Sequence, residues 1–71
     1  MEKEKPNQKL SLDKIRGALA EGRISQKSLA GFLQLTPQTV SNKLGGRTDF
    51  SVPEITAISV MTKKDISYFF D

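Results

Sequence analysis

One local pattern, repeated five times along the chain, restricts what this sequence can fold into. In each copy an apolar residue precedes a serine or threonine, and another apolar residue follows four positions after that hydroxyl residue. A hydroxyl at a helix start accepts a hydrogen bond from a free backbone amide, and the flanking apolar pair packs across the cap. The five copies are Leu10, Ser11, Ile15; Ile24, Ser25, Leu29; Leu35, Thr36, Val40; Phe50, Ser51, Ile55; and Met61, Thr62, Ile66. The pattern therefore predicts five helix starts in 71 residues.

Prolines and glycines support this interpretation and set the helix ends. Pro37 and Pro53 fall in first turns, where a missing N–H costs no hydrogen bond. Gly22 and Gly45 follow the first and third helices, where glycine commonly ends a helix. The predicted helices span residues 12–21, 26–33, 37–44, 52–61 and 63–70. Apolar and polar residues never alternate for long enough to indicate a strand, so we expect an all-α fold.

The first ten residues differ from the rest of the chain. They alternate charges around Pro6 and have no apolar periodicity. We therefore expect a flexible tail over residues 1–10 and a single domain over residues 11–71.

The residue types that the chain lacks exclude several classes of protein. Cysteine and histidine are both absent, so the chain offers no disulfide, no thiolate metal site and no imidazole base. Its eight carboxylates are scattered, and no nucleophile stands beside a base in the sequence. We therefore expect no enzyme activity, no metal and no cofactor. No apolar run reaches the roughly 18 residues that cross a bilayer, so we expect a protein of a bacterial cytoplasm.

Positive charge is concentrated in the middle third of the chain. Residues 22–48 carry four cations, which are Arg23, Lys27, Lys43 and Arg47, and no acid. The chain has 11 cations and 8 acids, so the other residues carry seven cations and eight acids. A basic region of this kind is typical of a phosphate-binding surface, although an ordinary solvated face has the same composition.

The helix predicted over residues 37–44 follows its predecessor after only a few residues, which requires a tight turn between two short helices. At about 100° per residue its apolar side chains point to one side and most of its polar side chains to the other. The apolar side consists of Val40 and Leu44. The polar side consists of Gln38, Thr39 and Asn42, and Lys43 lies at its edge. Glutamine and asparagine amides pair with adenine, and threonine contacts the thymine methyl group. The polar side suits the floor of a DNA major groove, or it is the solvated side of a surface helix.

The segment from Ser25 to Leu44, which reads SQKSLAGFLQLTPQTVSNKL, resembles the helix-turn-helix of the Cro/repressor type. The segment KLGGRTDFS, then Glu54 and Ile55, and the closing Tyr68, Phe69 and Phe70 resemble small regulators of temperate phages of Gram-positive bacteria. The resemblance covers residues 11–70. It implies a five-helix, lambda-repressor-like helix-turn-helix domain that binds operator DNA in a lysis–lysogeny switch inside the bacterial host cell.

The resemblance also implies roles for individual residues, with helix 37–44 in the major groove. Base reading falls to Gln38, Thr39 and Asn42. Contacts with the DNA backbone fall to Gln26, Lys27, Thr36, Lys43 and Arg47. Two positions depart from the family pattern: Gln34 stands where the turn usually has glycine, and Lys43 stands where the helix is usually apolar, with Leu44 packing in its place.

A second interpretation keeps the same fold but changes the partner. Lambda-type repressors carry a dimerisation domain, and this chain stops at Asp71 without one. The protein would then act as a modulator of repression that complexes a phage repressor rather than binding DNA alone. Either a homodimer on DNA or this hetero-complex needs an association surface, which we expect at Val60, Tyr68 and Phe70.

Overall fold

The structure is a computed structural model, and it describes residues 9–70. Its helices are α1 (Leu12–Glu21), α2 (Gln26–Leu33), α3 (Pro37–Leu44) and α4 (Val52–Thr62), followed by a short 3-10 helix, η1 (Ile66–Phe69). Among the described residues there is no strand, and the one extended pairing is an isolated antiparallel bridge between Leu10 and Phe70. The expected all-α fold is confirmed. The first four predicted helices are present, the fourth being one residue longer than predicted.

Four of the five predicted caps start helices as expected. The hydroxyls of Ser11, Ser25, Thr36 and Ser51 each accept a hydrogen bond from the backbone amide three residues later. Ser51 also forms a complete capping box, because the Glu54 carboxylate accepts a hydrogen bond from the Ser51 amide at 2.9 Å. These local bonds satisfy amides that the short helices leave without a partner in their first turns.

The predicted fifth α-helix over residues 63–70 is wrong. Lys63 ends α4 in the left-handed conformation, with φ of 59°, and only the four residues of η1 are helical after it. The Thr62 hydroxyl does not cap a new helix, because it donates to the Ile58 carbonyl at 2.7 Å inside α4. Asp65 caps η1 instead, its carboxylate accepting from the Ser67 amide at 2.9 Å. The fold is therefore four α-helices and one 3-10 turn.

A single apolar core joins all five helical segments. The buried stripes of α1 and α4 include Ile15, Leu19, Ile55 and Ile58, as their periodicity predicts. Phe69 of η1 is fully buried and closes this core. The complete buried set is Ile15, Ala18, Leu19, Leu29, Ala30, Val40, Leu44, Phe50, Ile55, Ile58 and Phe69. No charged or polar residue among the described ones is buried, so apolar packing alone holds the core together.

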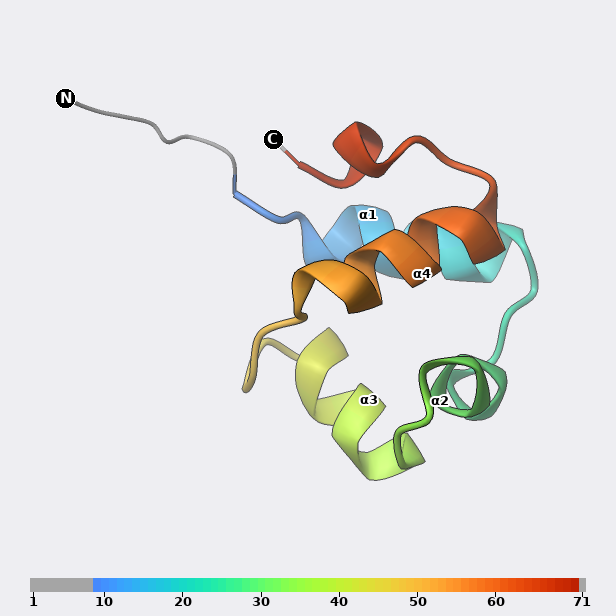
Figure 1. Ribbon diagram of the computed structural model, residues 1–71, viewed down its shortest axis with the longest axis vertical. Coiled ribbons are helices and arrows are strands. Elements are labelled where there is room, and N and C mark those ends of the chain that lie inside the picture. The colour runs from blue at the N-terminus through green and yellow to red at the C-terminus, as the bar shows by residue number, and fades with distance from the viewer. Residues whose placement is uncertain (1–8, 71) are drawn as a thin grey trace, which may run out of the picture.

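The helices are arranged in three parts (Figure 1). η1 lies on one side, α1 and α4 lie in the middle, and α2 and α3 lie on the opposite side. The two ends of the described chain meet beside η1, where the Ser11 amide donates to the Phe69 carbonyl at 2.7 Å. As a result, α3 lies on the side of the molecule away from both ends of the described residues.

Most of the predicted tail lies outside the described residues. Leu10, its last residue, is half-buried and packs against the core. No helix within residues 9–70 is long and apolar enough to cross a membrane.

Candidate nucleic-acid interface

Three residues, from Gln34 to Thr36, connect α2 to α3. Gln34 adopts the left-handed conformation with φ of 60° and ψ of 41°. The Leu35 amide then donates to the Ala30 carbonyl at 2.8 Å, which closes the end of α2. Ala30 and Val40 are both buried, and the small alanine side chain lets the two helices approach closely. The turn thereby fixes the direction in which α3 leaves α2.

The polar side of α3 faces outward, as predicted. Val40 and Leu44 are buried, whereas Gln38 is exposed and Asn42 is half-buried. The Gln38 Nε2 atom donates to Asn42 Oδ1 at 3.3 Å, so the two amides lie together on one strip of the helix. The structure therefore brings these two predicted base-reading residues together at the surface.

Two threonines at the start of α3 are joined to each other. Thr36 caps the helix by accepting a hydrogen bond from the Thr39 amide at 3.1 Å. The two hydroxyls also lie 2.8 Å apart, within hydrogen-bond distance. Thr39 is half-buried and Thr36 is exposed. Both hydroxyls thus have a partner within the protein, and any hydrogen bond to DNA would share or replace it.

A second attachment fixes the far end of α3. The Arg16 Nη1 atom of α1 donates to the Leu44 carbonyl at 2.6 Å, and the same guanidinium pairs with Asp13. Sequence reasoning missed Arg16, because nothing in the local pattern relates α1 to the end of α3. A cation at a helix C-terminus also interacts favourably with the carbonyl ends there.

Four of the five predicted backbone-contacting residues are exposed, namely Thr36 at the start of α3 and Gln26, Lys27 and Arg47. Gln26 and Lys27 occupy the first turn of α2, and Arg47 lies in the loop over residues 45–51 between α3 and α4. Gln26 also lines a surface hollow of 220 Å³ together with Arg16 and Leu44. The two exposed cations, Lys27 and Arg47, are available to bind phosphate oxygens.

Lys43 has a different environment from the other predicted contacts. Its side chain is only 14% exposed, and its Nζ atom lies 3.0 Å from Glu54 Oε1. The ammonium also donates to the Asp49 carbonyl at 2.8 Å and lies 5.8 Å from the centre of the Phe50 ring. The structure therefore turns Lys43 toward the 45–51 loop and α4, away from the predicted role at the DNA backbone.

The Glu54 carboxylate is shared between the α4 cap and Lys43. Burial acts to raise the pKa of Glu54, but the Ser51 amide and the Lys43 ammonium outweigh burial and hold it below its ordinary value of 4.5. Glu54 is therefore ionised at neutral pH. The ion pair and the cap depend on that charge.

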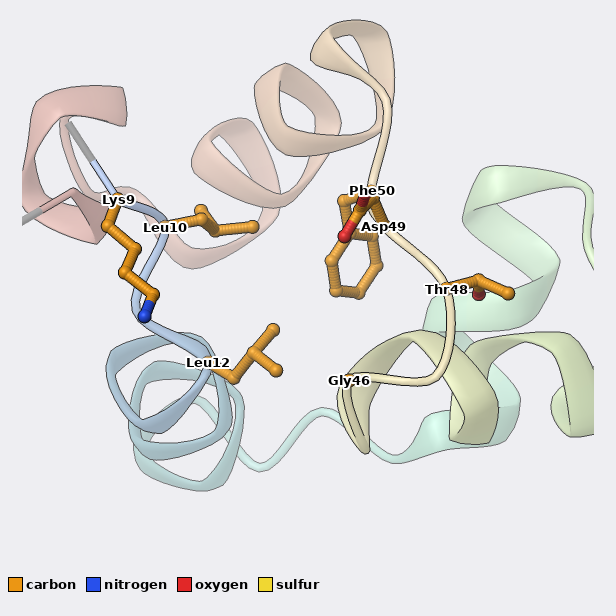
Figure 2. A pocket seen from close by; sticks show the side chains of 7 residues that line it. All are labelled: Lys9, Leu10, Leu12, Gly46, Thr48, Asp49 and Phe50. Carbon is orange, nitrogen blue, oxygen red and sulfur yellow. The ribbon is translucent and has the colours of Figure 1, made fainter. Parts of the chain in front are cut away.

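An apolar hollow of 240 Å³ lies between the start of α1 and the 45–51 loop (Figure 2). Leu10 and Leu12 line one side, and Phe50 lines the other. Gly46 also borders it, with a positive φ of 85° that favours glycine. The loop is thus incompletely packed against α1 on this inner side. In residues 9–70, no group of three or more acidic side chains is placed to share a metal ion.

The predicted association residues lie on α4 and around η1. Val60 is 65% exposed and Tyr68 is 44% exposed, whereas Phe70 is half-buried beside Leu10. The Tyr68 ring lies 5.0 Å from the Lys64 ammonium, which makes this part of the surface both aromatic and basic. Sequence reasoning missed Val52, which is 71% exposed at the start of α4.

No family model, no curated protein and no solved structure matches this chain.

Proposed function

We propose that this protein is a phage-type transcriptional regulator of the Cro/repressor kind that binds double-stranded DNA through a helix-turn-helix formed by α2 and α3. One observation carries the proposal. A tight turn with Gln34 in the left-handed conformation joins two short helices, and the second helix exposes the joined amides of Gln38 and Asn42. An α-helix fits the width of the major groove, and amide side chains recognise base edges there.

The surroundings of α3 support the same function. Lys27 precedes α3 in the sequence and Arg47 follows it, and both side chains are exposed. Contacts of such cations with phosphates set the register of a recognition helix on DNA. α3 also lies away from the two ends of the described residues, which meet beside η1 (Figure 1). A duplex can therefore approach α3 without displacing either end of the described chain.

The experiment that tests this function begins without a known operator. Random-sequence duplexes are selected on the purified protein, and binding to the enriched duplex is measured by fluorescence anisotropy. We expect a common sequence to be enriched, and we expect Asn42→Ala to bind it more weakly. Glu21→Gln, at an exposed position of α1, is the control and keeps the native affinity. Enrichment of no sequence, or equal binding by Asn42→Ala, would contradict sequence-specific DNA binding.

A second candidate function is modulation of a repressor by direct contact. The observation that favours it is the exposure of large apolar side chains on α4 and η1, namely Val52, Val60 and Tyr68. One small module buries only about 600–1,000 Å² on DNA, so tight binding usually needs a second module. That module is either another copy of this chain or a repressor partner that covers these side chains.

Sedimentation of the free protein distinguishes the two sources of a second module. We expect a monomer at micromolar concentration, with tighter assembly on DNA or with a repressor. Tyr68→Ala should weaken this assembly and leave the fold intact, because the side chain is 44% exposed. A stable dimer at low micromolar concentration would instead favour an autonomous repressor.

A further inference from the structure

Lys43 and Glu54 connect the end of α3 to the start of α4 across the loop that carries Arg47. The Lys43 ammonium lies 3.0 Å from Glu54 Oε1, and their side chains are only 14% and 18% exposed. Eleven positions separate the two residues, and the 45–51 loop lies between them. The pair therefore brackets the whole loop.

The same two side chains also bind the loop backbone directly. Lys43 donates to the Asp49 carbonyl at 2.8 Å, and Glu54 accepts from the Ser51 amide at 2.9 Å. At the other end of the loop, the Arg47 amide donates to the Asn42 carbonyl at 2.9 Å. Charged hydrogen bonds thus hold the second half of the loop, while a backbone bond to α3 holds Arg47.

Apolar packing holds this loop at Phe50, which is buried in the core, but it leaves the inner side of the loop incompletely filled. The hollow of 240 Å³ lies between Phe50 of the loop and Leu10 and Leu12 at the start of α1 (Figure 2). A loop beside an open space has few dispersion contacts that resist its movement. Phe50 anchors the loop in the core, and the polar bridge adds a second connection beside it.

We propose that Lys43 and Glu54 form a positioning pair, which holds the 45–51 loop so that Arg47 meets a DNA phosphate, and that Lys43 itself makes no DNA contact. This inference rests on the proposed DNA-binding function. It assigns Lys43 a different role from the phosphate or groove-edge contact that the family resemblance implies. It also makes Glu54, an acidic residue, a positive contributor to binding a polyanion.

The two roles of Lys43 predict opposite effects of Glu54→Gln on DNA affinity. If Lys43 bound phosphate, neutralising Glu54 would free the ammonium and remove a negative charge, and DNA would bind more tightly. If the pair positions the loop, Glu54→Gln and Lys43→Met each weaken binding by about fivefold, the loss expected for one phosphate contact. Lys43→Arg keeps a cation beside Glu54 and should retain most of the affinity.

Anisotropy titrations of selected and random duplexes test the proposal, with variant folding checked by circular dichroism. In an Arg47→Ala background, Lys43→Met and Glu54→Gln should cause no further loss, because both act through Arg47. Glu21→Gln breaks an ion pair of Glu21 with Lys64, at 3.0 Å, and serves as the matched control for Glu54→Gln with unchanged affinity. Tighter binding by Glu54→Gln, or full additivity with Arg47→Ala, would overturn the proposal.

Hydrogen exchange separates a failure of this inference from a failure of the proposed function. If the wild-type protein binds no duplex at all, the DNA-binding function fails. The Arg47 amide still reports the loop, because neither Lys43 nor Glu54 bonds to it directly. We expect its exchange to accelerate by about fivefold or more in both Lys43→Met and Glu54→Gln. Unchanged exchange in both variants would show that the pair does not hold the loop.

Discussion

The side chains of Gln38 and Asn42 lie one helical turn apart on α3, with Gln38 Nε2 3.3 Å from Asn42 Oδ1. Their hydrogen bond orients both amides before any ligand arrives, which limits the side-chain entropy lost on binding. Each amide still has donors and acceptors left for a base edge, because one bond uses only part of its capacity. The pair is therefore suited to act as one recognition unit rather than as two independent contacts.

We expect Gln38→Ala and Asn42→Ala to reduce sequence discrimination. Each should cost about 1–3 kcal/mol on a selected duplex and little on random DNA, since base contacts carry the specificity. Arg47→Ala should weaken both duplexes alike, because a phosphate contact is the same in every sequence. Anisotropy titrations on the two duplexes measure both effects. The same loss on both duplexes for all three variants would show that α3 does not read bases.

Salt dependence should report the number of phosphates that the protein contacts. Lys27 and Arg47 are the exposed cations of the interface, so log affinity should fall with log salt at a slope of about −2 per bound copy. Titrations between low and moderate salt concentration measure this slope. A slope near −3 would require another cation such as Lys43, and a flat dependence is incompatible with phosphate contacts.

Gln34→Gly should leave the fold unchanged in stability or stabilise it. The left-handed conformation costs an L-residue about 1–2 kcal/mol, which glycine avoids, but glycine loses more backbone entropy on folding. We expect a net gain between zero and about 1 kcal/mol in urea unfolding. Ala20→Gly, at an exposed helical position in α1, is the control and should lose about 1 kcal/mol. Clear destabilisation by Gln34→Gly would mean that Gln34 is not left-handed in solution.

The stability that Glu54 contributes should disappear in acid. Its pKa in the folded protein lies below the ordinary value of 4.5, so the contribution is complete above that value and is lost as pH falls through the folded pKa. At pH 7, Glu54→Gln should destabilise the protein by about 1 kcal/mol. Urea unfolding of both proteins across pH measures the difference, in which the other carboxylates cancel. A difference that persists in strong acid would show that the Glu54 charge is not its source.

Features that depend on neighbouring residues could be predicted from the sequence. Ser11, Ser25, Thr36 and Ser51 cap helices because a cap needs only a hydroxyl and an amide three residues later. These local rules predict the four α-helices. They also predict that α3 buries its apolar side and turns the Gln38 and Asn42 amides outward.

The end of the chain shows where local rules become ambiguous. The Thr62 hydroxyl has two possible hydrogen-bond partners. As a helix cap it would accept from the backbone amide three residues later, and within α4 it can donate to the Ile58 carbonyl one turn earlier. The structure uses the carbonyl, and Asp65 provides the cap for η1. Two possible capping residues, three positions apart, precede a segment that is too short for its apolar periodicity to decide between them.

The partner of Lys43 could not be predicted, because it depends on how the chain folds back. Glu54 is recognisable as a capping residue, but its second partner lies across the 45–51 loop. The hydrogen bond from Arg16 of α1 to the Leu44 carbonyl at the end of α3 is a similar case, since the two residues are 28 positions apart in the sequence. Contacts of this kind are set by tertiary packing and have no periodic signal in the sequence.

The most direct test of the proposed DNA-binding function is an NMR titration of the isotopically labelled protein with a selected duplex. We expect the largest amide shift changes over α3, at Arg47 and in the first turn of α2, with little change in η1. Such a result would put DNA on the side of the molecule formed by α2 and α3 (Figure 1). No change on addition of duplex, or changes confined to η1 and the exposed face of α4 around Val60, would contradict recognition of DNA through α3.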